Sequence, residues 1–420
     1  MKLGIDELLG DADRRKPLEG RRLALLGHPA SVTTDCRHTL DALADCPGMR
    51  VAAAFGPQHG MRGDKQDNMV ESDDYVDPRH GIPVFSLYGK TRRPAPEMMD
   101  TFDALLVDLQ DIGTRIYTYV ATLTYMLEAC AAQGKRVFIL DRPNPIGRPV
   151  EGSIREDGWE SLVGAAPLPM RHGLTLGELA RWYVGQKRLD LDLNVVTMGG
   201  YNPEAPPGFG WPVGELAWVN PSPNAASLNM ARCFPGTVLF EGTTLSEGRG
   251  TTTPLEVIGA PDLDPGAILD RMRKLAPEWL AGCALRPCFF EPTFHKHAGK
   301  TCAGIQIHTD NAHYRHASFR PYRLGALMLK SIRLEQPDYD LWRTFEYEYE
   351  TERRAIDLLS GGTFLREWVD DAGAGPADFD AAWFPTMRPL APRLAPDRAC
   401  VREALEVLRH AERPVLLAGT

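Results

Sequence analysis

The sequence lacks an excess of basic residues, and it lacks long apolar runs. Its 47 Lys and Arg residues are outnumbered by 56 Asp and Glu residues, giving a formal net charge of −9. This balance argues against a generally basic nucleic-acid surface, so we expect no nucleic-acid partner. Apolar runs such as Ala104–Val107 and Val137–Leu140 fall far short of the roughly 20 residues that cross a bilayer, and we expect no membrane partner. Residues 1–20 have neither an uninterrupted apolar region nor a small-residue cleavage site, which predicts a cytoplasmic protein.

Signatures of metal, nucleotide and serine-nucleophile sites are missing too. The eight cysteines form no CxxC pair, which indicates reduced thiols, and His295, His297 and His308 have no carboxylate at metal-ligand spacing. The turn after the first predicted strand, residues 27–31, lacks the spaced glycines of GxGxxG. The motifs GxxxxGK[ST] and GxSxG are also absent. We therefore expect no metal, no nicotinamide or nucleotide cofactor, and no serine-hydrolase chemistry.

The first half of the chain alternates short apolar strands with helical stretches. Strands are predicted over residues 22–26, 51–55, 84–87, 104–108, 137–141 and 193–198. A helix is predicted over 119–133, and another begins after Thr175, where Glu178 completes a capping box. Continuous apolar strands separated by helices predict an α/β fold with a Rossmann-like, mostly parallel sheet and helices on both faces.

The second half has a different pattern. Residues 199–255 are rich in proline, glycine and aromatics and predict long structured loops. Beyond them, helical stretches over 265–275, 323–334 and 402–410 mix with a short strand over 304–308. We predict two domains: a Rossmann-like catalytic domain over residues 1–260 and a smaller α+β auxiliary domain over residues 261–420.

Polar clusters follow the predicted strands at residues 57–60, 108–111 and 141–144. Parallel sheets place their sites in the loops at the carboxyl ends of strands, so these clusters are expected to meet. Carboxylates, amides and aromatic rings in such loops suit sugar recognition and glycoside hydrolysis, in which one carboxylic acid protonates the leaving oxygen. Taken singly, each acid also has a structural interpretation: Asp141 as an ion pair with Arg142, Asp108 as a helix cap, and Glu71 as a solvated loop residue.

Several longer motifs carry a specific resemblance that spans nearly the whole chain. They are FGPQHGMRG (55–63), VDLQDIGTRIYTY (107–119), LDRPNPIG (140–147), MRHGLTLGELA (170–180), NPSPN (220–224), PGTVLFEGTTLSEGRGTTTPLEVIGAP (235–261) and PTFHKHAGKTCAGIQIH (292–308). Together they resemble the exo-β-N-acetylmuramidase family of the NamZ type, formerly a domain of unknown function. The resemblance implies exo-hydrolysis of terminal N-acetylmuramic acid from peptidoglycan fragments in cell-wall recycling, with a muropeptide or an N-acetylmuramic acid disaccharide as substrate and no nicotinamide cofactor.

The same resemblance directs the choice of site residues. The family's first loop commonly reads PEHG, whereas this chain has Gln58, and an amide cannot act as a general acid. We therefore predict Glu71 as the acid, with Asp108 or Asp111 near the anomeric carbon; the alternative is that an Asp of residues 108–111 is itself the acid. The predicted substrate-binding residues are Gln58, His59, Gln110, Arg115, Tyr117, Tyr119, Asp141, Arg142, Asn144, His172, Glu241, Glu247 and Arg249. Among these, the three arginines are candidates for the lactyl carboxylate of the sugar, which suits a bidentate guanidinium.

Two alternative functions stay open at this point. Because Gln58 replaces an acid, the chain is alternatively a sugar- or muropeptide-binding protein that has lost catalysis. The sheet prediction alone also permits a Rossmann-type oxidoreductase, although the missing GxGxxG argues against it. A pair of carboxyl groups facing each other across a cleft would favour the hydrolase.

Overall fold

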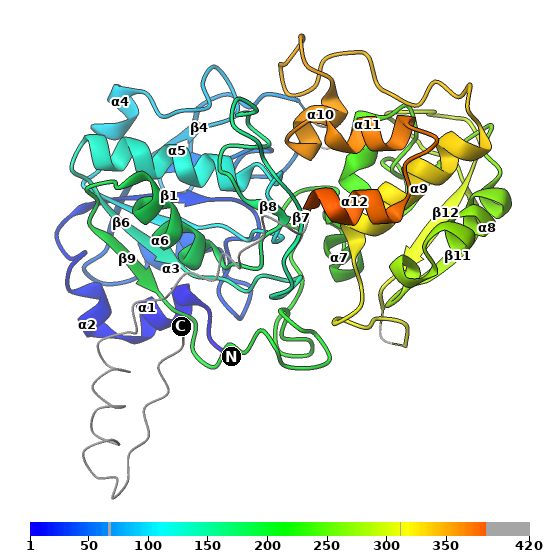
Figure 1. Cartoon of the computed structure of the whole chain (residues 1–420). Helices are drawn as coiled ribbons and strands as arrows, with labels where there is room; N and C mark the ends of the chain where they lie inside the picture. The colour runs from blue at the N-terminus through cyan, green and yellow to red at the C-terminus, as the bar shows by residue number, and fades with distance from the viewer. Residues whose placement is uncertain (66–68, 311, 384–420) are drawn as a thin grey trace, which may run out of the picture.

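A computed structural model describes residues 1–65, 69–310 and 312–383 of the chain, and it contains a seven-stranded sheet in its first half (Figure 1). The strand order is β3-β4-β2-β1-β5-β6-β9, and every neighbouring pair is parallel except β3 with β4. The strands are β1 (Arg22–Gly27), β2 (Arg50–Gly56), β3 (Tyr75–Val76), β4 (Pro83–Ser86), β5 (Ala104–Asp108), β6 (Arg136–Leu140) and β9 (Leu193–Val196). The predicted α/β fold with a mostly parallel sheet is confirmed.

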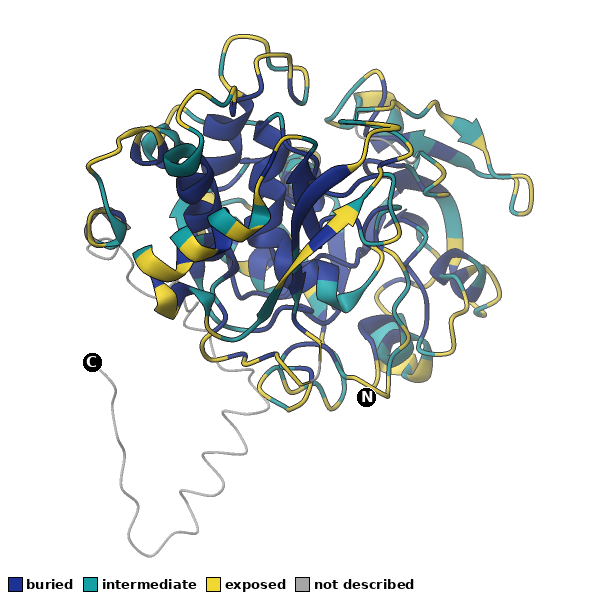
Figure 2. Ribbon diagram, turned by 90° about the vertical axis from the view of Figure 1, so that its right-hand side faces the viewer, coloured by how far each residue is buried: buried dark blue, intermediate teal, exposed yellow. Residues whose placement is uncertain are grey.

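Alternation along the central strands divides the core between the two faces of this sheet. Leu23 and Leu25 of β1 belong to one buried cluster, while Ala24 and Leu26 belong to the other, as a two-residue period requires. The first face packs under α1 (Gly4–Gly10) and α3 (Thr39–Ala44), and the second under α5 (Tyr119–Ala132) and α6 (Leu176–Lys187). Two short helices, α2 (Ala12–Arg15) and α4 (Pro96–Met99), complete this body. Figure 2 shows the central strands as the buried interior of the molecule.

The second body combines a three-stranded antiparallel sheet with a group of helices. Its sheet has the order β10-β12-β11, formed by β10 (Val257–Ala260), β11 (Ala284–Phe290) and β12 (Cys302–His308). The helical segments are α7 (Leu228–Thr237), η1 (Val238–Gly242), α8 (Pro265–Leu275), η2 (Pro277–Leu280), α9 (Pro321–Glu335), α10 (Ala355–Ser360), α11 (Phe364–Asp370) and α12 (Pro376–Trp383). The predicted helix over 402–410 lies outside the described residues, and the predicted domain boundary near residue 260 stays a prediction.

Helices α7 and α9 cross at two glycines. A Cβ on Gly236 would lie 1.9 Å from the carbonyl oxygen of Pro321, and one on Gly325 would lie 2.6 Å from the carbonyl oxygen of Gly236. Only glycine permits this backbone approach. The crossing fixes η1, which follows α7 directly and carries Glu241 towards the first body.

The two bodies are joined by buried polar contacts around a small hairpin, β7 (Glu151–Ile154) with β8 (Pro169–Arg171). The carboxylate of Glu151 accepts hydrogen bonds from the backbone N–H groups of Tyr322 and Arg323 in the first turn of α9. From the first body, the guanidinium of Arg115 donates to the carbonyl oxygens of Leu359 and Ser360 at the end of α10. Within residues 1–65, 69–310 and 312–383, no helix is long and apolar enough to cross a membrane.

Candidate active site

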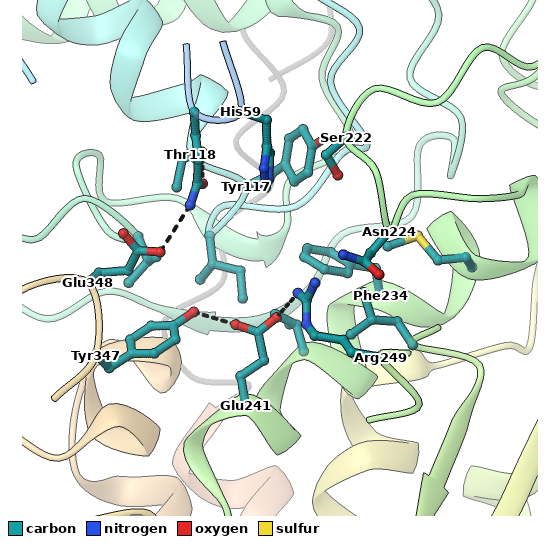
Figure 3. Close-up of a pocket in the computed structure, with 16 residues that line it drawn as sticks. His59, Tyr117, Thr118, Ser222, Asn224, Phe234, Glu241, Arg249, Tyr347 and Glu348 are labelled. Carbon is teal, nitrogen blue, oxygen red and sulfur yellow. Dashed lines mark hydrogen bonds and ion pairs between the residues drawn. The ribbon is translucent and has the colours of Figure 1, made fainter. Parts of the chain in front are cut away.

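A narrow pocket lies between the two bodies, at the carboxyl ends of the parallel strands (Figure 3). The first body contributes the loop after β2, with Gln58 and His59, and the loop after β5, with Tyr117 and Thr118. The facing residues come from residues 222–255 and from residues 343–350, a segment that we call the strap. The free space in the pocket is about 40 Å³, room for a few water molecules.

The amide of Gln58 is oriented by two partners of opposite character. Its oxygen accepts a hydrogen bond from the Thr118 hydroxyl at 2.7 Å, and Thr118 itself stands at the start of α5. Its nitrogen donates to Oε1 of Glu348 in the strap at 3.2 Å. An amide at this position therefore presents a donor to the carboxyl group, which a glutamate in the same place would do only when protonated.

Glu348 is held in the pocket by the first body. The Tyr88 hydroxyl donates to its Oε2 at 2.6 Å, and its backbone N–H lies 3.2 Å from the sulfur of Met69. Burial raises the pKa of the Glu348 carboxyl, and the nearby charge of Glu241 raises it further, while the hydrogen bonds from Tyr88 and Gln58 offset part of the effect. The Glu348 carboxyl thus binds its proton more tightly than a solvated glutamate does.

Cation–π contacts link the tip of the strap to the first body. The guanidinium of Arg92 lies over both the Tyr88 ring, at 4.1 Å, and the Tyr349 ring, at 4.6 Å. Glu348 and Tyr349 both have positive φ angles, 49° and 67°, a backbone region that is uncommon for residues other than glycine. Such backbone persists where surrounding contacts enforce it, and here those contacts aim the Glu348 side chain at Gln58.

Glu241 also lines the pocket, with different partners. The residue is only 3% exposed. Its carboxylate pairs with the guanidinium of Arg249 and accepts a hydrogen bond from the Tyr347 hydroxyl at 2.7 Å (Figure 3). Burial alone would lower the pKa of Arg249, but Glu241 and Glu247 raise it above its ordinary value. A permanent cation and a hydroxyl donor stabilise negative charge on Glu241.

Behind Arg249, the buried Glu247 forms a further charged cluster. Lys296 Nζ lies 2.8 Å from its Oε2, and Arg249 Nε and His295 Nδ1 lie 3.2 and 3.4 Å from its Oε1. Burial would raise the pKa of Glu247, yet these positive neighbours lower it to about 2. The cluster anchors Arg249 from behind, so its guanidinium stays against Glu241.

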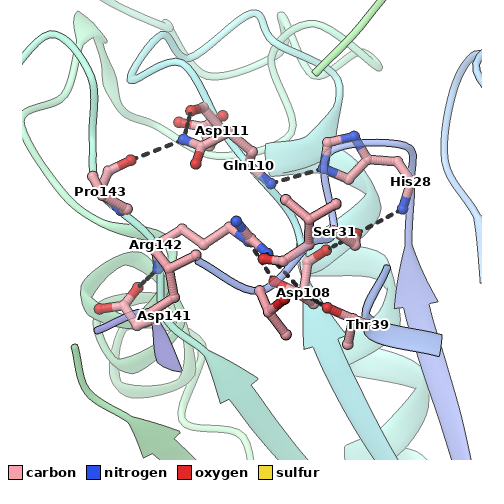
Figure 4. Close-up of polar contacts among 12 residues, drawn as sticks. His28, Ser31, Thr39, Asp108, Gln110, Asp111, Asp141, Arg142 and Pro143 are labelled. Carbon is pink, nitrogen blue, oxygen red and sulfur yellow. Dashed lines mark hydrogen bonds and ion pairs between the residues drawn. The ribbon is translucent and has the colours of Figure 1, made fainter. Parts of the chain in front are cut away.

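A second polar network lies beneath the strand ends, and most of its side chains bond to one another or to nearby backbone (Figure 4). Asp108 is completely buried and takes both a bidentate pair from Arg142 and a hydrogen bond from the Thr39 hydroxyl. Asp141 accepts from the Thr175 hydroxyl at 2.8 Å and from the backbone N–H of Gly177 at 2.9 Å. Burial nonetheless raises the pKa of Asp141 to about 6. Asp108 and Arg142 thus pair across neighbouring strand ends, whereas the ion pair expected between Asp141 and Arg142 is wrong, because Arg142 donates to Asp141 only through its backbone N–H. None of these three residues lines the pocket.

The other predicted residues fall into two groups. Gln58, His59, Tyr117, Glu241 and Arg249 line the pocket. The remainder are placed elsewhere, and most of them bond to neighbouring backbone: Glu71, Asp108, Asp111, Gln110, Arg115, Tyr119, Asp141, Arg142, Asn144, His172 and Glu247. The roles assigned to both groups from the sequence stay predictions.

Glu71 is the predicted acid whose position matters most. Its side chain is 51% exposed and pairs with Arg92 at 3.2 Å, on the outer side of the stacked guanidinium. It is therefore placed beside the strap's anchor and does not line the pocket. Asp111 is buried and lies 3.4 Å from His172 Nε2, where its Oδ2 also accepts from the Gly113 N–H.

Sequence reasoning missed the residues of the strap. Tyr347 and Glu348 lie in a loop without an apolar pattern, and Glu348 is 290 positions from its partner Gln58. The one signal available was the alternation of acids and tyrosines over residues 346–350, which is unusual for a solvated loop. Ser222 and Asn224, which also line the pocket, lie in the NPSPN motif that carried part of the resemblance.

Among the described residues no group of three or more His, Cys, Asp or Glu side chains is arranged to hold a metal ion. The chemistry available from these side chains is that of two carboxyl groups at one pocket: Glu348, whose pKa is raised by burial, and Glu241, which is held by Arg249 and Tyr347. Environments that separate two carboxyl groups in this way divide the acid and charge-stabilising roles in glycosidases.

Comparison with known proteins agrees with this chemistry. Family models described as exo-beta-N-acetylmuramidase NamZ, N-terminal and C-terminal, match residues 23–229 and 232–389. The chain is 38% identical over 373 residues to peptidoglycan beta-N-acetylmuramidase NamZ of Bacillus subtilis (strain 168), covering 88% of this chain and 84% of that protein.

Two solved structures are also similar to this chain in fold. Two DUF1343 family proteins from Bacteroides fragilis NCTC 9343 are similar to this chain, with TM-scores of 0.76 and 0.68 and identities of 31% and 26%. The first similarity covers 88% of this chain and 91% of that one, and the second covers 91% and 94%. The resemblance read from the sequence motifs is confirmed.

Proposed function

Because the chain belongs to the exo-beta-N-acetylmuramidase NamZ family, we propose that the pocket between its two bodies is the catalytic site. The protein is an exo-acting glycoside hydrolase that releases terminal N-acetylmuramic acid from the non-reducing end of peptidoglycan fragments. The finer substrate, a muropeptide or a disaccharide of N-acetylmuramic acid, belongs to this proposal. The predicted cytoplasmic location stays a prediction.

The observation that carries the proposed site is the contrast between Glu348 and Glu241. Burial favours the protonated form of Glu348, so this group serves as the general acid that protonates the glycosidic oxygen. Glu241 is held by Arg249 and by the Tyr347 hydroxyl, and it is the group placed to stabilise the positive charge that develops at the anomeric carbon.

This proposal gives the acid role to Glu348 in place of Glu71. Glu71 is half exposed, pairs with Arg92 and does not line the pocket, whereas a general acid must lie within reach of the glycosidic oxygen. Asp108 is unsuited to contact a substrate, because Arg142 and Thr39 already occupy its oxygens and no part of the residue is exposed. The family's common acid in the first loop is thus replaced by one from the strap, bonded to Gln58.

Arg249 is the predicted arginine that lines the pocket, and we assign it to the lactyl carboxylate of the sugar. Arg115 and Arg142 donate to backbone carbonyls and to Asp108 inside the fold. The lactyl carboxylate would lie beside the carboxylate of Glu241. The substrate therefore binds only if the Arg249 guanidinium interacts with both carboxylates at once.

The narrowness of the pocket implies movement before binding. About 40 Å³ cannot hold a pyranose ring. The strap is the part that can yield, because its contacts with the first body are side-chain bonds from Gln58, Tyr88 and Tyr349. Lifting the strap opens the pocket, and its return brings Glu348 against the bound sugar.

The experiment that tests this function uses two chromogenic glycosides. The β-glycoside of N-acetylmuramic acid should release its chromophore, and the N-acetylglucosamine counterpart, which lacks the lactyl group, should not. Arg249→Lys should lower kcat/KM on the first substrate. Release from neither glycoside, with binding of N-acetylmuramic acid retained, would mean that the chain is a binding protein.

A further inference from the structure

A second and wider recess adjoins the catalytic pocket. Its volume is about 460 Å³, and its lining includes Arg62, Trp218, Asn220 and Ser222. We call it the outer recess. Ser222 lines both the outer recess and the catalytic pocket, so the two spaces share a wall.

The same two loops run along both spaces. In the loop after β2, Gln58 and His59 line the pocket, and Arg62 a few residues on lines the outer recess. In the loop over residues 218–224, Trp218 lines the outer recess and Asn224 lines the pocket, with Ser222 at the junction. The two spaces are therefore the ends of one groove, narrow at the carboxyl pair and wide at Trp218.

An exo-acting glycosidase needs this division. The terminal sugar occupies a closed end, and the leaving group must extend from it towards solvent. From this arrangement, and resting on the function proposed above, we infer that the outer recess binds the leaving group: an N-acetylhexosamine ring stacked on Trp218, followed by an anionic continuation that meets Arg62.

Trp218 has the features of a sugar platform. Its indole Nε1 donates to the carbonyl oxygen of Ala225 at 2.9 Å, and its ring meets Trp211 edge-on with centroids 5.0 Å apart. Both contacts fix the plane of the ring while the side chain stays partly exposed in the recess. A fixed aromatic face offers the apolar C–H face of a hexosamine a large contact area at little entropic cost.

The loop that carries Trp218 is also fixed from beneath. The carbonyl oxygen of Pro221 accepts from the Tyr119 hydroxyl at 2.6 Å and lies 3.0 Å from His28 Nδ1. His28 Nε2 accepts from the backbone N–H of Gln110 at 2.9 Å, so the ring proton is on Nδ1, directed at Pro221. Buried Tyr119 and His28 thus act as positioning residues for the groove wall.

Arg62 supplies positive charge at the open end. It is exposed, and its guanidinium lies over the Tyr75 ring at 4.4 Å, which holds the side chain along the surface. In a peptidoglycan fragment the sugar beyond the leaving hexosamine carries a lactyl carboxylate or an acidic peptide. An exposed guanidinium attracts such groups in a manner that weakens with salt.

The test compares two alcohol leaving groups that both need protonation. Methyl β-N-acetylmuraminide has no ring in the outer recess, whereas the disaccharide N-acetylmuramyl-β-1,4-N-acetylglucosamine has one. Trp218→Ala should lower kcat/KM on the disaccharide about 10- to 100-fold, because one aromatic contact with the sugar is lost. The same substitution should change kcat/KM on the methyl glycoside less than about twofold. Trp218→Phe should restore most of the disaccharide rate. Trp182→Ala, a partly exposed tryptophan on α6, is the matched control.

The outcomes separate the inference from the proposed function. Wild-type protein that cleaves neither substrate overturns the proposed function itself. Wild-type cleavage of both, with Trp218→Ala lowering the two rates equally or not at all, overturns only the outer recess as leaving-group site. Arg62→Ala should leave the disaccharide rate unchanged and lower kcat/KM on a tetrasaccharide several-fold at low salt. An equal effect on both lengths would remove Arg62 from the inference.

Discussion

Replacing Glu348 by glutamine tests the catalytic assignment most directly. The variant keeps the size of the side chain, and its carbonyl oxygen can still accept from Tyr88 or from Gln58. At most one hydrogen bond is lost, about 1 kcal/mol of stability, so the fold should persist. The proton is lost, however, and general acid catalysis contributes about 10²- to 10⁴-fold, or about 3–5 kcal/mol of the barrier. We expect a fall of this size in kcat on the disaccharide.

The leaving group supplies an internal control for the same variant. A nitrophenyl glycoside releases a stable phenolate that needs little protonation, so Glu348→Gln should lower its rate far less than it lowers the disaccharide rate. The basic limb of the wild-type pH profile should reflect Glu348, whose pKa is raised by burial, with activity falling as the pH rises through that pKa. The variant should lose this limb.

Two further glutamine variants make the comparison decisive. Glu346 is exposed on the same strap, and Glu346→Gln should keep full activity and a normal Tm. Glu71→Gln tests the acid predicted from the sequence alone. If Glu348→Gln retains more than about a tenth of the wild-type kcat on the disaccharide, or if Glu71→Gln loses more activity than it does, the assignment of the acid to the strap is wrong.

Three other substitutions probe the polar framework. Gln58→Glu should place a second carboxyl against Glu348, raise the pKa of the pair and move the basic limb of the pH–rate profile to higher pH; an unmoved limb would separate Gln58 from the acid. Asp108→Asn should lower the free energy of unfolding in urea by about 3–5 kcal/mol, because Arg142 stays buried without its counter-charge, and a loss below about 1 kcal/mol would contradict this. Asp141 has a folded pKa of about 6 against an ordinary 3.8, so wild-type stability should fall by about 2 kcal/mol between pH 4 and 7 relative to Asp141→Asn, whose stability over that range should be flatter.

The sheet could be predicted because its strands are continuous apolar runs. Strand β5 is buried on both faces, and a run such as ALLVD has no other stable place in a fold of this kind. Strand β3 was missed because it has two residues, pairs only at the sheet edge, and leaves no apolar pattern. A two-residue apolar period reveals a strand because alternate residues are buried in the core. An edge strand of two residues is too short to show that period.

The site was harder to predict, for a different physical reason. The strand-end rule correctly brought Asp108 and Arg142 together, but proximity does not reveal that the two groups satisfy each other completely. The sequence indicates which polar groups lie at neighbouring strand ends. It does not indicate which of them remain accessible to a substrate. Glu348 was missed because its place depends on the strap crossing between the bodies, a contact that no local pattern encodes.

The position of the acid on the strap has a consequence for the order of events. Glu348 reaches the pocket only while Tyr88 and Gln58 hold the strap against the first body. If the strap lifts to admit the sugar, as proposed above, the acid leaves the pocket with it and returns only when these two hydrogen bonds re-form. Placing the acid on the strap would therefore couple closure over the bound sugar to the step that breaks the glycosidic bond.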